Sequence, residues 1–347
     1  MSALRSALER LLERRHLTQP EACELLGELI RPETSAAMAG AVLAALRAKG
    51  VVAAEVRGLA EGMRAHARRP QLPEGLRAID VVGTGGDGSG SLNISTGTAL
   101  LVAACGIPVV KHGNRSVSSR AGSADVLEAL GVPVPLDEQA APACLAAARF
   151  TFLFAPYYHP AMKALAPVRS ALGVRTVFNL LGPLTNPALP PLYVIGAPRL
   201  EEAQLIAETL CGMPIERAFV VHGAQGWDEP TPVGPFTLFD VRAGEIHSGT
   251  RSAAQYGLPS CGASQLAGGD ARHNAAALRA VLTGEDRGPH RDCLLLGAAL
   301  ALEVAGVADS PATAVAHAAR AIDSGAAAAV LAALTGFASA FAPQGAS

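Results

Sequence analysis

The residues whose types suit chemistry gather in three short segments, each following a run of apolar residues typical of a buried strand. The first, 83–96, is rich in glycine, and the second, 111–119, holds a lysine, a histidine, an asparagine, an arginine and three serines. The third, 222–229, ends in the adjacent carboxylates of Asp228 and Glu229. In open α/β sheets, ligands bind beyond the carboxyl ends of the strands. The three segments therefore predict one shared site, although each alone also fits a solvated loop.

The first segment has glycine at positions 83, 85, 86, 88 and 90. Glycine at this density indicates positive φ angles or a backbone that other groups approach closely. A predicted strand, 78–82, precedes the segment, and a predicted helix, 95–105, follows it. Free backbone amides and the positive end of the helix dipole would then face one point. We interpret the segment as a phosphate cradle. A flexible surface connection is disfavoured because both flanks are strongly apolar.

The other two segments supply charges of both signs. Lys111 and Arg115 suit phosphate oxygens, whereas His112 fits an orienting or structural role equally well. Asp228 and Glu229 suit a hard divalent cation, most simply Mg²⁺, and the alternative is an ordinary acidic turn. No G-x-x-x-x-G-K-[ST] sequence follows the first predicted strand, which disfavours a P-loop nucleotidase, and the match to G-x-G-x-x-G is too permissive to carry weight.

Two kinds of element must position these segments. Residues 1–70 have helical apolar spacing throughout, and 160–187 returns to that spacing later in the chain. In between and beyond, short strands alternate with helices, which predicts an α/β fold with a mainly parallel central sheet surrounded by helices. The predicted strands are 78–82, 107–110, 150–154, 193–195 and 218–221, followed by a hairpin over 237–247 and a helical tail from 270. Ser123 is the predicted N-cap of a helix over 124–130.

Composition limits the class of protein. Of 347 residues, 50% are apolar and 17% charged, enough for a large core, and the net charge of −2 argues against a nucleic-acid-binding surface. The six cysteines are widely spaced without a C-x-x-C pair, which predicts free thiols in a reducing compartment. The charged N-terminus does not fit a signal peptide, and no apolar run reaches about 18 residues. We therefore expect a cytoplasmic protein with no membrane partner.

Five motifs, in the same order over nearly the whole chain, resemble those of the anthranilate phosphoribosyltransferase family. They are Gly83-Thr-Gly-Gly-Asp87, Asn93-Ile-Ser-Thr96, Lys111-His-Gly-Asn-Arg-Ser-Val-Ser-Ser119, Gly122-Ser-Ala-Asp-Val-Leu-Glu-Ala-Leu-Gly131 and Gly173-Val-Arg-Thr-Val-Phe-Asn-Leu-Leu-Gly-Pro-Leu-Thr-Asn-Pro187. The resemblance implies transfer of the phosphoribosyl group of 5-phosphoribosyl 1-diphosphate (PRPP) to the amine of anthranilate, releasing pyrophosphate, in the second step of tryptophan biosynthesis from chorismate.

The resemblance also implies a fold shared with class II nucleoside phosphorylases, in which a small helical domain is hinged to a large α/β domain. On this chain the small domain is expected at 1–72, joined by about 160–187. The large domain is expected at 73–159 and 188–347. A homodimer formed through the helical domain is implied as well.

Site residues follow from the resemblance position by position. The implied PRPP contacts are Gly83, Gly86, Asp87, Ser91, Asn93, Ile94, Ser95, Thr96, Lys111, His112, Gly113, Asn114, Arg115, Ser116, Val117, Ser118, Ser119 and Ser123. The implied anthranilate contacts are Gly83, Asn114 and Arg169, and the implied ligands of two Mg²⁺ ions are Ser95, Asp228 and Glu229. No acid or base is implied, because an aromatic amine is already nucleophilic. Asn114, Arg169 and Lys111 are expected to position the reactants.

Three positions depart from the family pattern. Ala224-Gln-Gly-Trp227 replaces an Asp-Gly-Leu lead-in, Gly297 stands where Asn is usual, and Arg120-Ala121 replaces Lys-Ser. None removes an implied phosphate or metal ligand. Two alternatives remain at this stage. A pyrimidine nucleoside phosphorylase of the same fold would read Lys-His-Ser-Thr-Gly-Gly from Lys111 onward, and a nucleic-acid-binding relative would need a basic surface.

Overall fold

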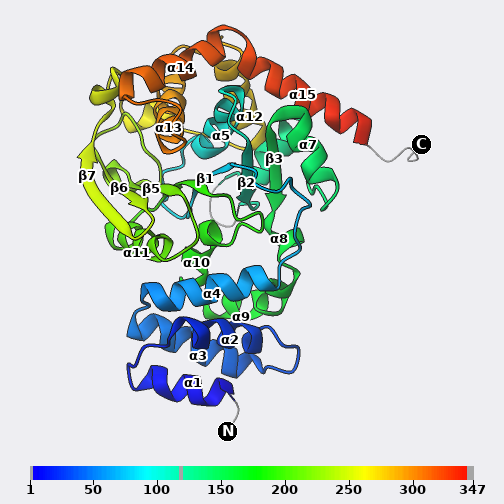
Figure 1. Cartoon of the computed structure of the whole chain (residues 1–347), viewed down its shortest axis with the longest axis vertical. Coiled ribbons are helices and arrows are strands. Elements are labelled where there is room, and N and C mark those ends of the chain that lie inside the picture. Colours follow the sequence, from blue (N-terminus) through cyan, green and yellow to red (C-terminus); the bar gives the residue numbers. More distant parts are fainter. Residues whose placement is uncertain (1–2, 117–119, 342–347) are drawn as a thin grey trace.

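A helical bundle sits below a larger α/β region in the computed structural model, which describes residues 3–116 and 120–341 (Figure 1). This is the predicted fold class. The bundle is formed by α1 (Ala3–Leu12), α2 (Gln19–Leu29), α3 (Ala36–Lys49) and α4 (Ala53–Ala65). Capping residues set the ends of these helices, as α3 shows. The Ser35 hydroxyl accepts the Met38 N–H at 3.3 Å at the start of α3, and Gly50 closes that helix with a φ of 84°.

Small residues let α2 and α4 pack closely. A Cβ on Gly58 would lie 2.1 Å from the main-chain oxygen of Gln19, and one on Gly62 would lie 2.9 Å from a Leu26 methyl. Alanine at either position would push the helices apart, because buried side chains are packed too densely to yield.

The α/β region is built on one seven-stranded sheet of order β3-β2-β1-β4-β5-β6-β7. Its first five strands are parallel, and β6 and β7 join antiparallel as the predicted hairpin. The strands are β1 (Ile79–Gly83), β2 (Val109–Gly113), β3 (Phe150–Phe154), β4 (Leu192–Gly196), β5 (Arg217–His222), β6 (Phe236–Arg242) and β7 (Glu245–Arg251).

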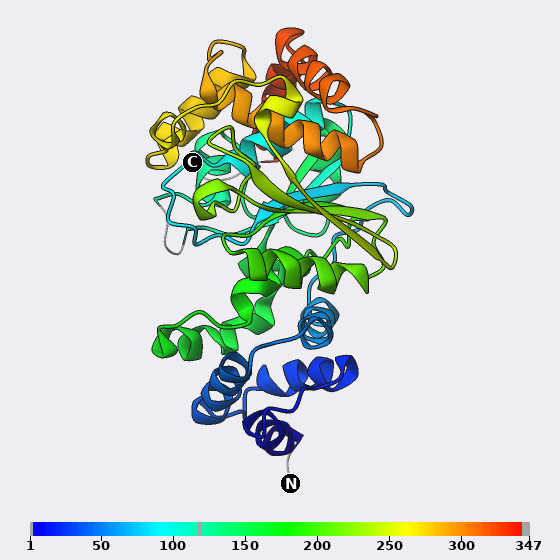
Figure 2. The ribbon, with the colours of Figure 1, turned by 90° about the vertical axis from the view of Figure 1, so that its left-hand side faces the viewer.

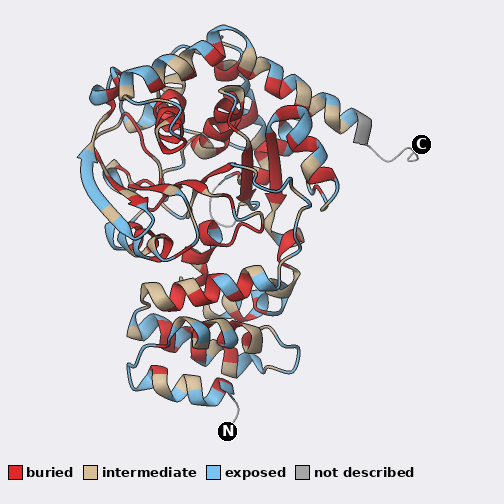
Figure 3. Ribbon diagram, in the orientation of Figure 1, coloured by how far each residue is buried: buried red, intermediate tan, exposed pale blue. Residues whose placement is uncertain are grey.

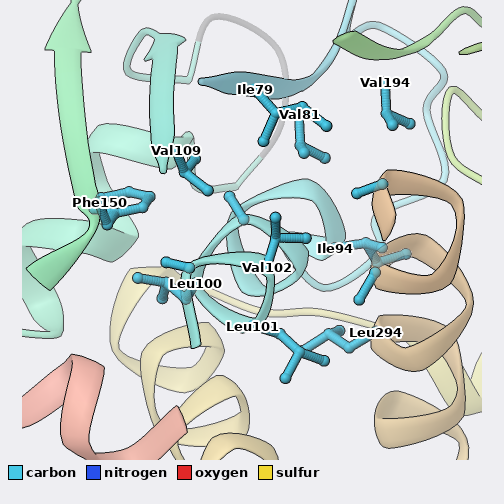
Figure 4. Packing of buried hydrophobic residues seen from close by; sticks show 14 of the residues in the cluster. Ile79, Val81, Ile94, Leu100, Leu101, Val102, Val109, Phe150, Val194 and Leu294 are labelled. Carbon is cyan, nitrogen blue, oxygen red and sulfur yellow. The ribbon is translucent and has the colours of Figure 1, made fainter. Parts of the chain in front are cut away.

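Alternating side chains send the sheet's two faces into different cores. On β4, Leu192 and Val194 pack into one cluster, while Tyr193 and Ile195 pack into the other. Figure 4 shows the first cluster, where side chains of the parallel strands meet α5 (Ile94–Ala104) and Leu294 of α13 (Pro289–Val304). Most of these strand residues are buried, whereas the outer strand β7 is largely exposed (Figure 3).

Further helices complete the layer around α5 and α13. They are α6 (Ser123–Ala129), α7 (Ala140–Ala148), α12 (Ala271–Leu282), α14 (Pro311–Asp323) and α15 (Ala326–Phe341). Among the described residues, no single helix is long and apolar enough to cross a membrane, and only the bent pair Pro311–Asp323 and Ala326–Ser339 passes that test, by length and composition alone. Short 3₁₀ turns occur at η3 (Ala224–Gly226), η4 (Ala253–Tyr256) and η5 (Ala263–Leu266).

The second core joins the bundle to the other face of the sheet. It contains bundle leucines, the β4 side chains Tyr193 and Ile195, and apolar residues of α11 (Leu200–Cys211). Leu165 and Val168 belong to the same cluster, so the helical segment after β3 packs with the bundle. Figure 2 shows this segment beside the N-terminal helices. It consists of α8 (Ala155–Tyr158), η1 (Pro160–Ala164), α9 (Ala166–Leu172), α10 (Phe178–Leu181) and η2 (Gly182–Leu184).

Two local predictions are wrong. Strand β2 ends at Gly113 rather than at residue 110, because it pairs along the whole of β3, so Lys111 and His112 lie in the sheet and not in a loop. Ser123 is not the N-cap of α6. Gly122 takes that position, and the Asp125 carboxylate accepts the Gly122 N–H at 2.8 Å.

Candidate active site

The carboxyl edge of the parallel strands brings the first and third chemical segments together. Asp228 lies between the ends of β1 and β4, where its Oδ2 accepts the Gly85 N–H at 2.6 Å. The Thr84 N–H donates to the main-chain oxygen of Gly196 at 2.9 Å, which holds the two strand ends side by side. Asp228 is buried. A carboxylate from late in the chain therefore orders the glycine loop.

Both predicted reasons for the glycines hold. Gly85, Gly86, Gly88 and Gly90 have φ angles of 74°, 78°, 71° and 63°, the left-handed region that favours glycine. Gly83 has an ordinary φ but no free space, since a Cβ there would lie 2.3 Å from Asp228 Oδ2. The far end of the loop is tied to residues 266–268, because the Gly268 N–H donates to Gly90 O at 2.8 Å and the Leu92 N–H to Leu266 O at 3.0 Å.

The start of α5 completes this wall of the site. Glu229 Oε1 accepts the Ser95 N–H at 3.0 Å, so an amide from the first turn of the helix faces the acidic pair. Asn93 is held from both sides, by donating to Ala121 O at 3.1 Å and accepting from Asn274 at 2.8 Å. The Thr96 hydroxyl donates to Ser123 Oγ at 3.1 Å, which links α5 to α6. The Ser89 and Ser91 hydroxyls contact each other at 3.1 Å within the loop.

Three carboxylates crowd this wall. Burial and the negative charge of Asp87 raise the pKa of Asp228. Burial and the charge of Asp228 raise the pKa of Glu229. Within the described chain, Asp87 Oδ2 is buried without a hydrogen-bond partner. Such a set of oxygens with excess negative charge fits a bound divalent cation, which would remove the repulsion.

The carboxylates do not form a protein-only metal cage. Over residues 3–116 and 120–341, no group of three or more His, Cys, Asp or Glu side chains has the arrangement to hold a metal ion. Mg²⁺ characteristically takes one or two carboxylates and fills its remaining positions with water and substrate phosphate. Asp228, Glu229 and the Ser95 hydroxyl fit that limited role, with the phosphate supplied by a substrate.

Lys111 lies behind this wall. Its side chain is 1% exposed, and Nζ donates to Val81 O at 2.6 Å and lies 3.5 Å from Ser95 Oγ. Burial lowers its pKa, while the charges of Asp80, Glu229 and Asp228 act in the opposite direction. Lys111 is therefore an internal counter-charge to the acidic pair in this structure. Asp80, whose pKa burial raises to about 6, is fixed by Asn186 Nδ2 at 2.9 Å.

The second chemical segment is only partly described. Asn114 is exposed, and its Oδ1 accepts the Arg115 N–H at 2.7 Å. The Arg115 guanidinium pairs with Asp125 at 2.9 Å and with Glu128 at 2.6 Å, and these hydrogen bonds raise its pKa. The predicted contacts Val117, Ser118 and Ser119 lie outside the described residues. Arg115 is thus neutralised by acidic neighbours rather than directed at the glycine loop.

Two buried histidines lie behind the second segment. The rings of His112 and His159 are 5.1 Å apart and packed edge to face, and His112 Nδ1 lies 3.2 Å from Gly182 O. Burial lowers the pKa of His112 to about 3 and that of His159 to about 4. Both imidazoles are neutral at pH 7, so His112 is not a cation for phosphate.

Arg169 lies on α9, in the segment that packs with the bundle, rather than at the strand ends. Its guanidinium stacks over the Phe178 ring at 5.3 Å, and burial lowers its pKa. Within the described residues, no carboxylate pairs with it. A half-buried unpaired guanidinium on an aromatic ring suits a planar aromatic carboxylate.

Sequence reasoning missed residues that the fold brings to the site. Arg175 lies against Gly86, and Asn186 bridges Asp80 and Val110 O. Both occur in the 173–187 motif, so the motif was the available signal, but neither residue follows a strand. A cavity of about 470 Å³ lies near the start of β1, beside Arg77 and Glu216, and none of the candidate site residues lines it.

This fold and site define a class of enzyme that transfers glycosyl groups. A model of the glycosyl transferase family α/β domain matches residues 75–328, and a model of that family's helical bundle domain matches residues 5–67. The anthranilate phosphoribosyltransferase of Syntrophotalea carbinolica is 43% identical over 346 residues, covering 95% of this chain and 98% of that relative. The chain belongs to the anthranilate phosphoribosyltransferase family.

Solved structures agree. The anthranilate phosphoribosyltransferase of Thermus thermophilus matches with a TM-score of 0.89 at 40% identity, covering 96% of this chain and 99% of that one. The Saccharomyces cerevisiae enzyme in complex with PRPP and Mg matches with a TM-score of 0.88 at 26% identity, covering 97% and 98%. The same yeast enzyme is also known in complex with 4-fluoroanthranilate.

Proposed function

We propose that this protein transfers the 5-phosphoribosyl group of PRPP to the amine of anthranilate, giving N-(5-phosphoribosyl)anthranilate and pyrophosphate. The observation that carries the proposal is the wall formed by the glycine loop, the start of α5 and the pair Asp228–Glu229. The proposal is also supported by the similarity of this chain, over nearly its whole length, to anthranilate phosphoribosyltransferases.

The diphosphate of PRPP is proposed to bind the glycine loop. Amides of a loop with four left-handed glycines, together with the first amides of α5, form a concave set of donors for anionic oxygens. The predicted residues from Gly83 to Ser123 are proposed to surround PRPP as a whole, and those of the glycine loop and the start of α5 are proposed to contact its diphosphate. Negative charge accumulates on the leaving pyrophosphate as the bond to the ribose breaks, and donors fixed in advance stabilise it without reorganisation.

Asp228 and Glu229, with the Ser95 hydroxyl, would hold Mg²⁺, and we propose two ions per site. When bound, Mg²⁺ would neutralise charge on the diphosphate. The protein's own part is to orient the two carboxylates, which the Gly85 and Ser95 amides do, while the charge of the buried Lys111 offsets part of the rise in the pKa of Glu229.

The attack of anthranilate on the ribose requires correct positioning of its amine rather than a general base. Its aromatic amine is uncharged near pH 7, and the buried neutral histidines offer no strong base. Arg169 is proposed to pair with the anthranilate carboxylate, and Asn114 and Gly83 to line the same position. Holding the amine near the ribose carbon supplies rate by proximity.

We propose 1–72 with about 160–187 as a small domain hinged to 73–159 and 188–347, so that closure excludes water that would hydrolyse PRPP. The packing of α9 against α3, where a Cβ on Gly40 would lie 3.8 Å from a Val168 methyl, supports grouping 160–187 with the bundle. A homodimer through the bundle is proposed, supported by Leu12 of α1, which is 67% exposed. The free cysteines support a reducing compartment, the cytoplasm.

The test is loss of anthranilate fluorescence after adding enzyme, PRPP and Mg²⁺. We expect continuous loss with PRPP and Mg²⁺ present and none without either. No loss under complete conditions would overturn the proposal. Phosphorolysis of uridine or thymidine by inorganic phosphate, measured in parallel, would instead support the phosphorylase alternative.

A further inference from the structure

Arg175 fills the space that Gly86 leaves open. A Cβ on Gly86 would lie 2.4 Å from Arg175 Nη1, so a side chain there would have to displace the guanidinium from its present position. Gly86 also has a φ of 78°, which side chains rarely adopt. The loop between α9 and α10 thus places a permanent cation, the Arg175 guanidinium, against the glycine loop, although Gly86 precedes Arg175 by 89 positions in the sequence.

The guanidinium has few partners. Within the described residues, Arg175 Nε and Nη2 are buried and have no hydrogen-bond partner. Nη2 lies 3.5 Å from Glu202 Oε2, an ion pair too long to be a good hydrogen bond, and that oxygen is unpartnered as well. The other Glu202 oxygen binds Arg199. An arginine offers five N–H donors, and within the described residues the three on Nε and Nη2 of Arg175 have no acceptor.

Arg175 is also held from the bundle side. Its main-chain oxygen accepts a hydrogen bond from the Arg47 guanidinium of α3. The next residue, Thr176, donates its N–H to Asn179 Oδ1 at 2.9 Å at the start of α10. The guanidinium thus extends to the glycine loop of the α/β region from a segment anchored to the bundle.

The other cations predicted for phosphate are engaged elsewhere. Lys111 Nζ is buried against Val81 O, and Arg115 is paired with Asp125 and Glu128. Of the described side chains of Lys111, Arg115 and Arg175, only that of Arg175 contacts the glycine loop and still has N–H donors without an acceptor. The loop's anion site would otherwise depend on amides and a metal alone.

We propose that Arg175 is a substrate-binding residue that contacts the diphosphate of PRPP at Gly86, and that Glu202 holds the guanidinium in place before the anion binds. This inference rests on the proposed function for the identity of the diphosphate. A fork of N–H donors matches phosphate oxygens, and its bond to an anion is stronger than its long pair with Glu202. Because the segment carrying Arg175 is bound to the bundle, occupation of the loop also favours the closed arrangement of the two domains.

The test compares Arg175→Gln, Arg175→Lys and the control Arg199→Gln. Arg199 pairs with the same Glu202 but is 59% exposed at its side chain, so its loss disturbs Glu202 without removing a cation from the glycine loop. For each variant, binding of pyrophosphate with Mg²⁺ is measured by calorimetry, and KM is measured for PRPP and for anthranilate.

We expect Arg175→Gln to weaken pyrophosphate binding and raise the KM for PRPP by about tenfold or more, the usual worth of a charge-assisted contact. Arg175→Lys should retain part of the binding, and Arg199→Gln should stay within about twofold. Unchanged pyrophosphate affinity in folded Arg175→Gln, or an equal loss in Arg199→Gln, would overturn the inference. Wild-type protein that binds pyrophosphate through Arg175 but consumes no anthranilate would overturn the proposed function alone.

Discussion

The main chain of Asp228 leaves no room for a side chain at Gly196. A Cβ on Gly196 would lie 1.7 Å from the main-chain oxygen of Asp228, closer than any real contact. The same aspartate covers Gly83 with its carboxylate. Two strand-ending glycines therefore fix the position of one acidic residue, and with it the position of the neighbouring Glu229.

Gly196→Ala is expected to displace the Asp228 main chain. Overpacking of this kind costs about 1–3 kcal/mol of unfolding free energy. The acidic pair should move with it, so the Mg²⁺ concentration for half-maximal activity should rise. Chemical denaturation and Mg²⁺ titration measure the two effects. Gly249→Ala is the control, because nothing lies within 4 Å of that position on exposed β7. An unchanged Mg²⁺ requirement in Gly196→Ala would contradict the proposed metal role.

The double variant Asp228→Asn, Glu229→Gln should remain folded but need far more Mg²⁺. Both side chains keep an oxygen for the Gly85 and Ser95 amides, so the loop should persist. Burial already raises the pKa of each group, so their charges cost stability at pH 7, and the metal-free variant should melt no lower than wild type.

Turnover across a Mg²⁺ series after EDTA treatment, together with thermal melting, tests this variant. Wild-type turnover at low Mg²⁺ would remove both residues as ligands. A large drop in melting temperature would show that they are needed for folding instead.

Arg169→Ala should mainly raise the KM for anthranilate. A hydrogen bond to a charged group contributes roughly 1.5–3 kcal/mol, equivalent to about 10- to 150-fold. The KM for PRPP should change little, because Arg169 lies on α9 and stacks on Phe178 rather than on the glycine loop. Arg169→Lys serves as the charge-retaining control, and its KM for anthranilate should lie between those of wild type and Arg169→Ala. An anthranilate KM equal to that of wild type would place this substrate elsewhere.

His159 should make the fold sensitive to mild acid. Burial lowers its pKa from 6.5 to about 4, so between these values the unfolded chain binds a proton that the folded protein excludes. The contribution of neutral His159 to the free energy of unfolding is therefore fully present above pH 6.5 and is lost as the pH falls toward 4. Between about pH 7 and about pH 5 the loss is roughly 2 kcal/mol.

The check on His159 is a comparison of unfolding free energies at about pH 7 and about pH 5 in wild type and His159→Asn. Buried carboxylates such as Asp80, whose pKa is raised to about 6, act in the opposite direction in both proteins and cancel in the difference. The variant should lose about 2 kcal/mol less than wild type on acidification. Equal losses would show that His159 is protonated in the folded state.

Much of the fold was predictable because local spacing encodes it. Alternating strands and helices, the bundle helices, and the return to helical spacing at 160–187 all follow from side-chain periods that the backbone geometry imposes. The end of β2 was not predictable in this way. Lys111 and His112 are polar, and only pairing with β3 shows that they are buried strand residues.

The sequence by itself determined the chemical inventory of the site, namely a glycine loop with left-handed positions, a helix start and an acidic pair. The tertiary structure decided which groups meet. Gly85 and Asp228 are 143 positions apart, and Arg175 reaches Gly86 from a segment packed on the bundle. Spacing along the chain carries no such information, because these contacts form where the parallel strands end at one edge of the sheet. Which charged side chains face that edge depends on their burial and on their ion-pair partners. For that reason Lys111 and Arg115 are engaged elsewhere, and Arg175 is the cation at the loop.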